Sequence, residues 1–257
     1  MTAMERLVLT ALLDIPSVSP GDDITLIIET ALDRSEIVLE PGDVIVITQK
    51  IVSKAEDRYV DLEKVIPSEY ARCLADEVEK DPRLVEVILS ESTDVVRKST
   101  GILVTEHRLG FVLANAGVDS SNIDQSEGHS SVLLLPTDPD KICGEIRNRI
   151  ETEIGVCVGI IINDSHGRAW RNGTVGVALG SAGLPALLDL RGRPDIFGTD
   201  LKITQVGLAD EIAAAASVLM GQGDEMRPVV HVRGVPYPLS AGKASDLLRN
   251  KQEDLFR

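Results

Sequence analysis

The sequence predicts an α/β fold, of the α+β kind in which parallel and antiparallel strands share a mixed sheet. Short β-branched runs such as 44–48 alternate with segments of helical apolar spacing such as 22–35. This alternation favours a sheet covered by helices. The runs 102–105 and 111–114 flank a short turn, a hairpin pattern that adds antiparallel strands. We therefore expect a mixed sheet.

Local signals predict the individual elements. Helices are expected where an Asp or Ser precedes helical spacing, and where Pro takes the first helical position at residues 82 and 139. The predicted helices are 22–35 (capped by Asp22), 68–79, 81–90, 138–154, 206–220 and, in the charged tail, 244–252. The predicted strands are 7–13, 44–48, 102–105, 111–114, 132–135, 156–162 and 229–232.

Composition bounds the class of protein. The chain has 257 residues, 43% of them hydrophobic, enough for a single unit over 1–257 with a sizeable core. The net charge of −15 argues against nucleic acid as a partner, because phosphate backbones require a basic face. No stretch approaches 18 apolar residues, so no membrane span is expected. Three widely spaced cysteines without a CxxC pair favour a reducing, cytoplasmic setting.

Two acidic residues follow strand-like runs. Asp119 comes shortly after the run 111–114, and Asp164 with Ser165 ends the apolar run 156–162. Strand-end carboxylates beside hydroxyls suit Mg²⁺ or Mn²⁺, so the two acids are candidates to share one divalent metal. The alternative for the first stretch is an Asx-turn with an N-cap.

A lysine pair follows the predicted strand 44–48. Lys50 and Lys54 stand at the carboxyl end of that strand, where cations suit phosphate groups. Alternatively, they are solvated lysines four residues apart on a helix face. At the other end of the chain, the loop Gly221-Gln222-Gly223-Asp224-Glu225 has glycines that let a backbone approach a ligand closely.

The stretch 164–201 is rich in glycine. It holds seven of the 21 glycines and the single tryptophan, Trp170, between Arg168 and Arg171. We assign 163–201 to a second lobe that shapes a substrate pocket or dimer contact, and 1–162 plus 202–257 to a nucleotide- and metal-binding lobe. The alternative is a structural insertion. The aromatic ring and two cations are candidates to hold an anionic substrate.

Common nucleotide and nucleophile motifs are missing. The sequence has no GxxxxGK[ST], GxGxxG or GxSxG. Two acids, a lysine pair and a glycine loop remain, and together they favour metal-assisted phosphoryl transfer.

Four motifs carry a resemblance to a known family. TQKIVSKAE (48–56), ANAGVDSSN (114–122), INDSHGRAWRNGTVGVALG (162–180) and ADEIAAAASVLMGQG (209–223) resemble those of the coenzyme F-420:L-glutamate ligases, the F-420 γ-glutamyl ligases. The similarity extends from about Leu13 to Gly234.

The resemblance implies a two-lobed γ-glutamyl ligase fold and a reaction. GTP would phosphorylate the terminal carboxylate of the F-420 precursor, F-420-0. The amine of L-glutamate would then attack the acyl phosphate, giving an amide, GDP and phosphate, and later rounds would add γ-linked glutamates. Phosphorylation supplies the leaving group that a carboxylate lacks, and divalent metal would neutralise the moving charge.

The resemblance also implies roles for individual residues. Asp119 and Asp164 would bind one metal, with Ser165 and Gln222 at a second; Lys54 joins the two acids in the catalytic set. K⁺ is a further cation implied. The GTP-contacting residues would be Ile15, Pro16, Ser17, Val18, Gln49, Lys50, Lys54, Asn122, Met220, Gly221, Gln222, Gly223, Asp224, Glu225, Met226 and Arg227.

The sequence departs from the family pattern at a few of these positions. Family members often have Thr at the position of Ser165 and Glu at that of Gln222, so the second metal is expected to bind more weakly here. The segment 224–227 is less rich in glycine than the family's. A homodimer is also implied. The competing interpretations are a related amide ligase for another carboxylate, and a non-catalytic nucleotide-binding module.

Overall fold

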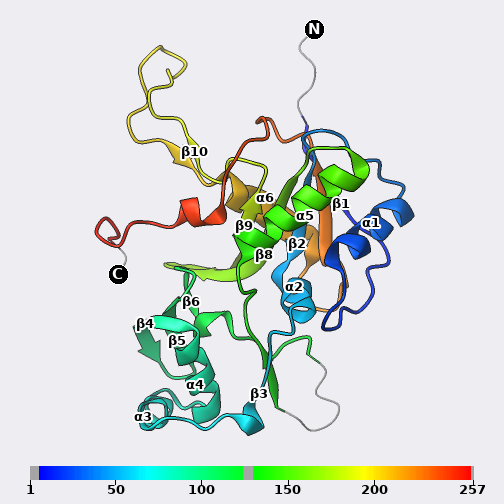
Figure 1. Cartoon of the computed structure of the whole chain (residues 1–257). Coiled ribbons are helices and arrows are strands. Elements are labelled where there is room, and N and C mark those ends of the chain that lie inside the picture. Colours follow the sequence, from blue (N-terminus) through cyan, green and yellow to red (C-terminus); the bar gives the residue numbers. More distant parts are fainter. Residues whose placement is uncertain (1–5, 124–129, 256–257) are drawn as a thin grey trace.

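A computed structural model describes residues 6–123 and 130–255, and it is built around a five-stranded mixed sheet (Figure 1). The strand order is β1-β12-β2-β8-β9. β2 (Val44–Thr48) runs parallel to β8 (Gly159–Arg168). β1 (Val8–Ala11), β12 (Val229–Arg233) and β9 (Arg171–Ala182) pair antiparallel with their neighbours. The predicted mixed sheet is confirmed.

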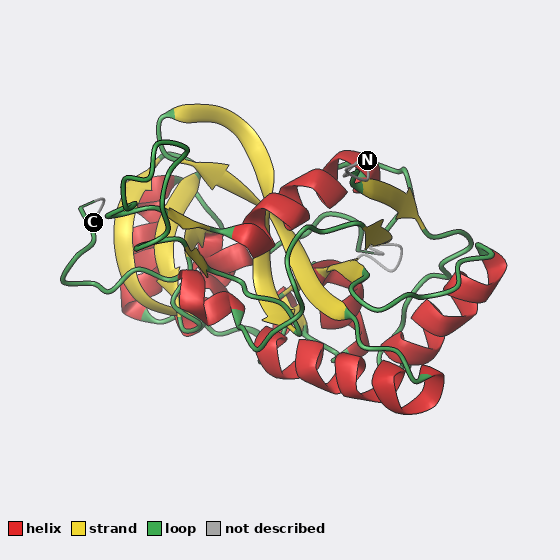
Figure 2. Cartoon of the chain, turned by 90° about the horizontal axis from the view of Figure 1, so that it is seen from above, coloured by secondary structure: helices red, strands yellow, loops and turns green. Residues whose placement is uncertain are grey.

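Helices cover both faces of this sheet. α1 (Ile24–Arg34), α2 (Gln49–Ala55) and α5 (Pro139–Ile154) share one hydrophobic cluster with β2 and β8. α6 (Leu208–Met220) packs on the opposite face. Figure 2 shows the strands in yellow with the helices, in red, around them. β2 is the middle strand of this order, so its residues 44–47 are fully buried.

The ends of α5 follow the predicted signals closely. The Asp138 carboxylate accepts from the backbone N–H of Lys141, and Pro139 fills the first helical position. Gly155 ends the helix in the left-handed conformation, at a φ of 80°. In α1, by contrast, the N-cap is Asp23 and not Asp22, because the Asp23 carboxylate accepts from Leu26 N–H.

Two glycines of β9 explain part of the glycine-rich composition of this region. A Cβ on Gly176 would lie 2.5 Å from the carbonyl oxygen of Ala213 in α6. A Cβ on Gly180 would lie 2.4 Å from the carbonyl oxygen of Pro139 in α5. The glycines therefore let one helix approach each face of the hairpin that β8 and β9 form.

Residues 59–123 and 130–133 form a second body, which we call the small lobe; the rest of the described chain is the large lobe. The small lobe lies below the sheet in Figure 1 and has hydrophobic clusters of its own. Its elements are β3 (Tyr59–Asp61), the 3₁₀ turn η1 (Leu62–Lys64), α3 (Glu69–Val78), α4 (Pro82–Ser90), β4 (Ser92–Ser99), β5 (Ile102–His107), β6 (Val112–Ala114), η2 (Asn115–Gly117) and β7 (Ser131–Leu133). The expected hairpin of β5 and β6 is confirmed, and β4 is an additional strand beside it.

The segment between β10 (Leu188–Asp189) and β11 (Gln205–Val206) extends from the large lobe as an arm, yellow in Figure 1. Residues 163–182, in the predicted second lobe, belong to β8 and β9 and the turn between them. Whether 163–201 acts as a substrate lobe stays a prediction. In the described part of the chain, every helix is too short or too polar to traverse a bilayer.

The predicted tail helix 244–252 is wrong. Only the 3₁₀ turn η3 (Ala244–Leu247) forms there. The Asp140 carboxylate accepts from the N–H groups of Ala244 and Ser245, which fixes the turn against α5. Leu248 then leaves helical geometry, with ψ at 130°.

Candidate functional site

Most of the predicted nucleotide-contacting segments converge on one edge of the central sheet. Strand registers place Ala11 opposite Val230, Val229 opposite Ile47, and Thr48 opposite Asn163. The loop after β1, the start of α2 and the loop before β12 therefore lie at the same edge as residues 163–165 of β8. The Thr48 N–H donates to the Pro228 carbonyl over 2.8 Å, which ties two of these segments together.

At this edge, the lysine pair faces the predicted metal-binding acid from the other lobe. Lys50 Nζ lies 2.7 Å from Asp119 Oδ2 and donates to Ser121 Oγ over 2.5 Å. Lys54 Nζ donates to the Asn122 carbonyl over 2.8 Å. The structure thus brings together four of the predicted site residues, and neither lysine simply extends into solvent.

Local hydrogen bonds fix the Asp119 carboxylate. Its Oδ1 accepts from the Ser121 N–H over 2.7 Å and its Oδ2 from the Ser121 hydroxyl over 2.9 Å. This is the Asx-turn that was the alternative interpretation, so the turn and the lysine contact occur together. Ser121 is a site residue that the sequence analysis did not select, although its place two residues after Asp119 is the usual signal for such a turn.

Burial and charge act on the ionisation of these groups. Burial raises the pKa of Asp119, but the Lys50 ammonium and the Ser121 donors outweigh it and hold that pKa below its ordinary value. Burial lowers the pKa of Lys54, and the nearby Lys50 charge lowers it further. At such a site, the lysines can exchange the carboxylate for phosphate oxygens, and the carboxylate can exchange the lysines for a metal ion.

Asp164 and Ser165 are not at a strand end as predicted. β8 continues to Arg168, and Asp164 pairs with Val177 of β9 in mid-strand. The strand is longer than its apolar run because β9 supplies backbone partners along its polar half. Asp164 Oδ2 lies 3.2 Å from Nε2 of His166, whose ring packs edge-on against Phe111 of the small lobe at 6.4 Å between centroids.

The loop after α6 is closed by one of its own acids. The Glu225 carboxylate accepts from the Gly223 N–H over 2.8 Å and lies where a Cβ of Gly221 would be. These N–H contacts hold the pKa of Glu225 below its ordinary value. Gln222 is exposed, with Nε2 3.5 Å from Ser217 Oγ. Asp224, Met226 and Arg227 are also exposed.

Several predicted contact residues have side chains in the protein interior. Ile15 and Val18 belong to the core cluster under α1, whereas Pro16 and Ser17 between them are exposed. Gln49 is buried, and its Oε1 accepts from the Ser53 hydroxyl over 2.8 Å. Because the side chains of Ile15, Val18 and Gln49 are buried, this placement does not favour their contact with a nucleotide. The backbone groups of these three residues remain at the edge.

Asn163 is a buried polar residue that the sequence analysis missed. Its Nδ2 lies 3.3 Å from the sulfur of Met220, and its buried Oδ1 has no hydrogen-bond partner among the described residues. An amide side chain directly after the apolar run 156–162 was the available signal. The contact joins β8 to the end of α6, where the glycine loop begins.

The Arg168, Trp170 and Arg171 group lies around the turn between β8 and β9.

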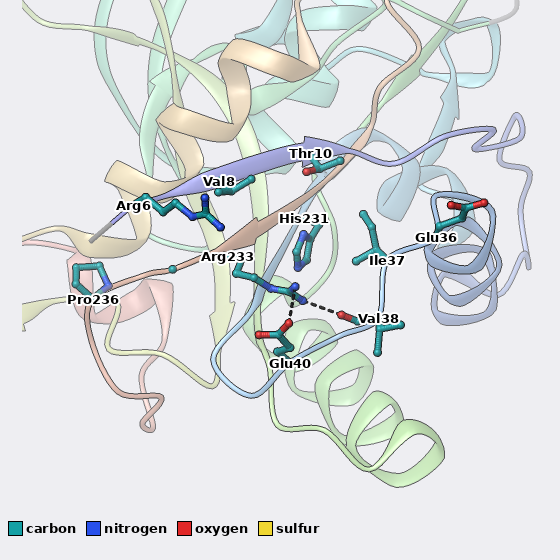
Figure 3. Close-up of a pocket in the computed structure, with 11 residues that line it drawn as sticks. Arg6, Val8, Thr10, Glu36, Ile37, Val38, Glu40, His231, Arg233 and Pro236 are labelled. Carbon is teal, nitrogen blue, oxygen red and sulfur yellow. Dashed lines mark hydrogen bonds and ion pairs between the residues drawn. The ribbon is translucent and has the colours of Figure 1, made fainter. Parts of the chain in front are cut away.

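The opposite edge of the sheet holds a hollow of about 740 Å³, a size that suits a small molecule (Figure 3). Of the two arginines that line it, Arg233 is paired with acids. Arg233 binds the Asp43 carboxylate, with Nε to Oδ1 at 2.8 Å, and its Nη1 lies 2.7 Å from Glu40. Arg6 also lines the hollow, and neither Lys50 nor Lys54 does.

The donor chemistry at the candidate site suits a hard cation. Among the described residues, no three His, Cys, Asp or Glu side chains gather as a preformed metal site. Mg²⁺ commonly takes only one or two carboxylates and completes its shell with water and substrate phosphates. Asp119 is ionised and hydrogen-bonded to oxygen and nitrogen donors that a cation would replace. The residues thus fit a substrate-completed metal site.

A mixed α/β sheet that gathers a lysine pair, an ionised aspartate and a glycine loop at one edge suits an enzyme that binds anionic groups. Comparison with known proteins specifies the class. The sequence model of the family described as F420-0:Gamma-glutamyl ligase matches residues 13–234. The chain belongs to this family and is a ligase.

Three similar proteins carry the name Coenzyme F420:L-glutamate ligase. The chain is 43% identical to that of Methanocaldococcus jannaschii over 249 residues, covering 95% of each chain. It is 44% identical to that of Methanopyrus kandleri over 244 residues, covering 93% of each. It is 38% identical to that of Archaeoglobus fulgidus over 243 residues, covering 95% of this chain and 93% of the relative.

Proposed function

We propose that the protein is a GTP-dependent ligase that joins L-glutamate to the F420 precursor through an acyl phosphate. Family membership and the names of the relatives support the two substrates. The single observation that supports the phosphate chemistry is the approach of Lys50 and Lys54 to Asp119 and Asn122 at the sheet edge. Further γ-linked glutamates would follow in later rounds.

The chain's own residues have separate tasks in this proposal. Lys54, crowded and partly desolvated, would hold the transferring phosphate as negative charge moves onto the leaving oxygen. Lys50 would exchange the Asp119 carboxylate for a neighbouring phosphate oxygen. The backbone of the 220–227 loop would approach the nucleotide closely once the Glu225 carboxylate leaves its place beside Gly221 and Gly223. The exposed Pro16 and Ser17 lie at the same edge.

Divalent metal is part of the proposal. Asp119 and Asp164 would hold one Mg²⁺ or Mn²⁺ ion, and Ser165 with Gln222 would hold a second more weakly. When bound, such ions neutralise phosphate charge and polarise the phosphoryl group. K⁺ stays a prediction that rests on the family resemblance. Ser165 and Gln222 are the weaker ligands in this set, because each offers a single neutral oxygen, whereas the two acids offer charged carboxylates.

A homodimer is also proposed. The arm between β10 and β11 exposes Ile196, Phe197 and Ile203, each more than 80% accessible. Large apolar side chains that are gathered on a projecting segment favour a protein contact.

The three free cysteines accord with the predicted cytoplasmic setting.

The first experiment is one incubation of purified protein with F420-0, L-glutamate, GTP and either Mn²⁺ or Mg²⁺. Mass spectrometry should show gains in steps of one glutamate residue, with GDP formed only when all components are present. Replacing GTP by ATP tests nucleotide choice, and replacing F420-0 by other carboxylates tests the related-ligase alternative. No mass gain with either metal and either nucleotide would refute the proposed activity.

A further inference from the structure

The two lobes are joined by two chain segments, and both pass through one polar cluster. The first segment, 56–58, leads from α2 into β3; the second, 134–138, leads from β7 into α5. They are paired, because the Leu134 N–H donates to the Arg58 carbonyl over 3.0 Å. The Thr137 N–H also donates to Oε2 of Glu56 over 2.9 Å. We call this pair of segments the junction.

A buried glutamate at the end of α4 organises the cluster. Glu91 is 9% exposed, and its Oε2 accepts from Arg58 Nη2 over 2.9 Å and from Arg108 Nε over 3.1 Å. His107 Nε2 lies 3.3 Å from the same oxygen. The Leu109 N–H donates to His107 Nδ1, so the ring proton lies on Nε2 and points at Glu91.

Each of the two arginines also binds the second junction segment. Arg58 Nε donates to the Leu135 carbonyl over 2.9 Å, and Arg108 Nη1 donates to the Thr137 carbonyl over 3.2 Å. One carboxylate therefore orients two guanidinium groups, and these reach across to the carbonyls of the chain that returns to the large lobe. Arg58 belongs to the junction, whereas Arg108 belongs to the turn between β5 and β6.

The candidate site depends on the geometry of this junction. Lys50 and Lys54 are in α2, directly before the first segment, while Asp119 and Asn122 belong to the small lobe. A small rotation at 56–58 or 134–138 would change the distance between the two sets. A buried charged cluster adds little net stability compared with apolar packing, but it restricts geometry because each partner must be satisfied in one arrangement.

We propose that Glu91 is a positioning residue that fixes the orientation of the two lobes, and through it the contact between the lysine pair and Asp119. Only the kinetic consequence of this inference rests on the proposed function. The structural consequence, a fixed distance between lobes, is independent of any substrate.

Native cysteines allow this distance to be measured directly. Cys73 in α3 and Cys157 before β8 are exposed, one in each lobe, whereas Cys143 is buried. Nitroxide labels on the two exposed thiols, with labelled chains diluted into unlabelled ones, report the distance within one chain by pulsed electron paramagnetic resonance. The wild-type chain should give one narrow distribution. Glu91→Gln should broaden it at least twofold, and Glu91→Asp should restore part of the narrow component.

Kinetics give the second measurement. Below the unfolding temperature, Glu91→Gln should lower kcat for glutamate addition at least tenfold, with Glu91→Asp intermediate. The matched control is Val85→Ala, which weakens the buried core of the small lobe but leaves the junction intact. This control should lose stability and keep the wild-type distance distribution and kcat.

The outcomes separate the two proposals. If Glu91→Gln keeps the narrow distribution and a kcat within twofold of wild type, the positioning role is refuted. If wild type shows no ligase activity, the proposed function fails, and the distance measurement still decides the role of Glu91. Should Glu91→Gln not fold, Arg108→Met takes its place, since methionine keeps an alkyl chain but donates to neither Glu91 nor the Thr137 carbonyl; an unchanged distribution there would equally refute the proposal.

Discussion

Lys50 Nζ lies 2.7 Å from Asp119 Oδ2, so a cation of the large lobe meets an anion of the small lobe. Lys50 lies in α2 and Asp119 in the turn after β6, and no sequence pattern relates the two residues. Their contact places the predicted phosphate-binding and metal-binding groups in a single site.

The first prediction concerns Asp119. Asp119→Asn keeps the size and turn-forming ability of the side chain but removes its charge, so turnover should fall by about 100-fold or more. Mass spectrometry of glutamate addition measures the loss, and circular dichroism should show an unchanged fold. Substantial turnover by this variant would contradict the proposed metal role of Asp119.

The second prediction concerns Lys54. Lys54→Met keeps the alkyl chain but removes a charged donor worth about 1.5–3 kcal/mol to a phosphate. The kcat/KM for GTP should fall by roughly tenfold or more. Lys202→Met, at an exposed position in the arm, is the matched control and should behave as wild type. Equal kcat/KM values for both variants would argue against a phosphate contact by Lys54.

The third prediction concerns Gln222. Its neutral side chain is exposed at the glycine loop, and Gln222→Glu would place a carboxylate there. An added negative charge should lower the concentration of Mn²⁺ or Mg²⁺ needed for half-maximal activity by about threefold or more. A metal titration of initial rates tests this, and an unchanged midpoint would remove Gln222 from the proposed second metal site.

The fourth prediction concerns packing against β9. A Cβ on Gly180 would lie 2.4 Å from the Pro139 carbonyl oxygen, and backbone cannot move aside cheaply. Gly180→Ala should therefore cost about 1–3 kcal/mol of unfolding free energy. Gly167→Ala, in the same hairpin with nothing within 4 Å, should change stability by less than about 0.5 kcal/mol. Urea unfolding compares the two variants.

The fifth prediction concerns acid pH. Burial opposes ionisation of Glu91, but His107, Arg58 and Arg108 outweigh it and lower its pKa from 4.5 to about 2. A folded-state pKa below the unfolded one gives stability that is present above pH 4.5 and lost as the pH falls toward 2. The corresponding free energy is about 3 kcal/mol.

The comparison of wild type with Glu91→Gln isolates this effect. The difference in their unfolding free energies should be largest near neutral pH and should shrink as the pH falls from 4.5 toward 2. Urea unfolding at a series of pH values measures it. If this difference stays constant over this range, the cluster does not lower the pKa of Glu91.

Sequence alone determined the elements whose signals are local. The Ser68 and Asp138 caps, the prolines at 82 and 139 and the buried run of β2 act within a few residues of the structures that they specify. The family motifs likewise lie within continuous stretches. For the same reason, the hairpin of β5 and β6 was predictable from the turn that joins its strands.

Tertiary structure alone decided the features that depend on distant partners. β8 runs on past Asp164 because β9 pairs with it, and the tail turns away after Leu247 because Asp140 holds its start. The contact of Lys50 with Asp119 and the junction cluster at Glu91 join segments that no sequence spacing relates. Their geometry depends on how the two lobes meet, with Phe111 and Leu113 of the small lobe packed into the core of the large lobe, and only long-range packing fixes that arrangement.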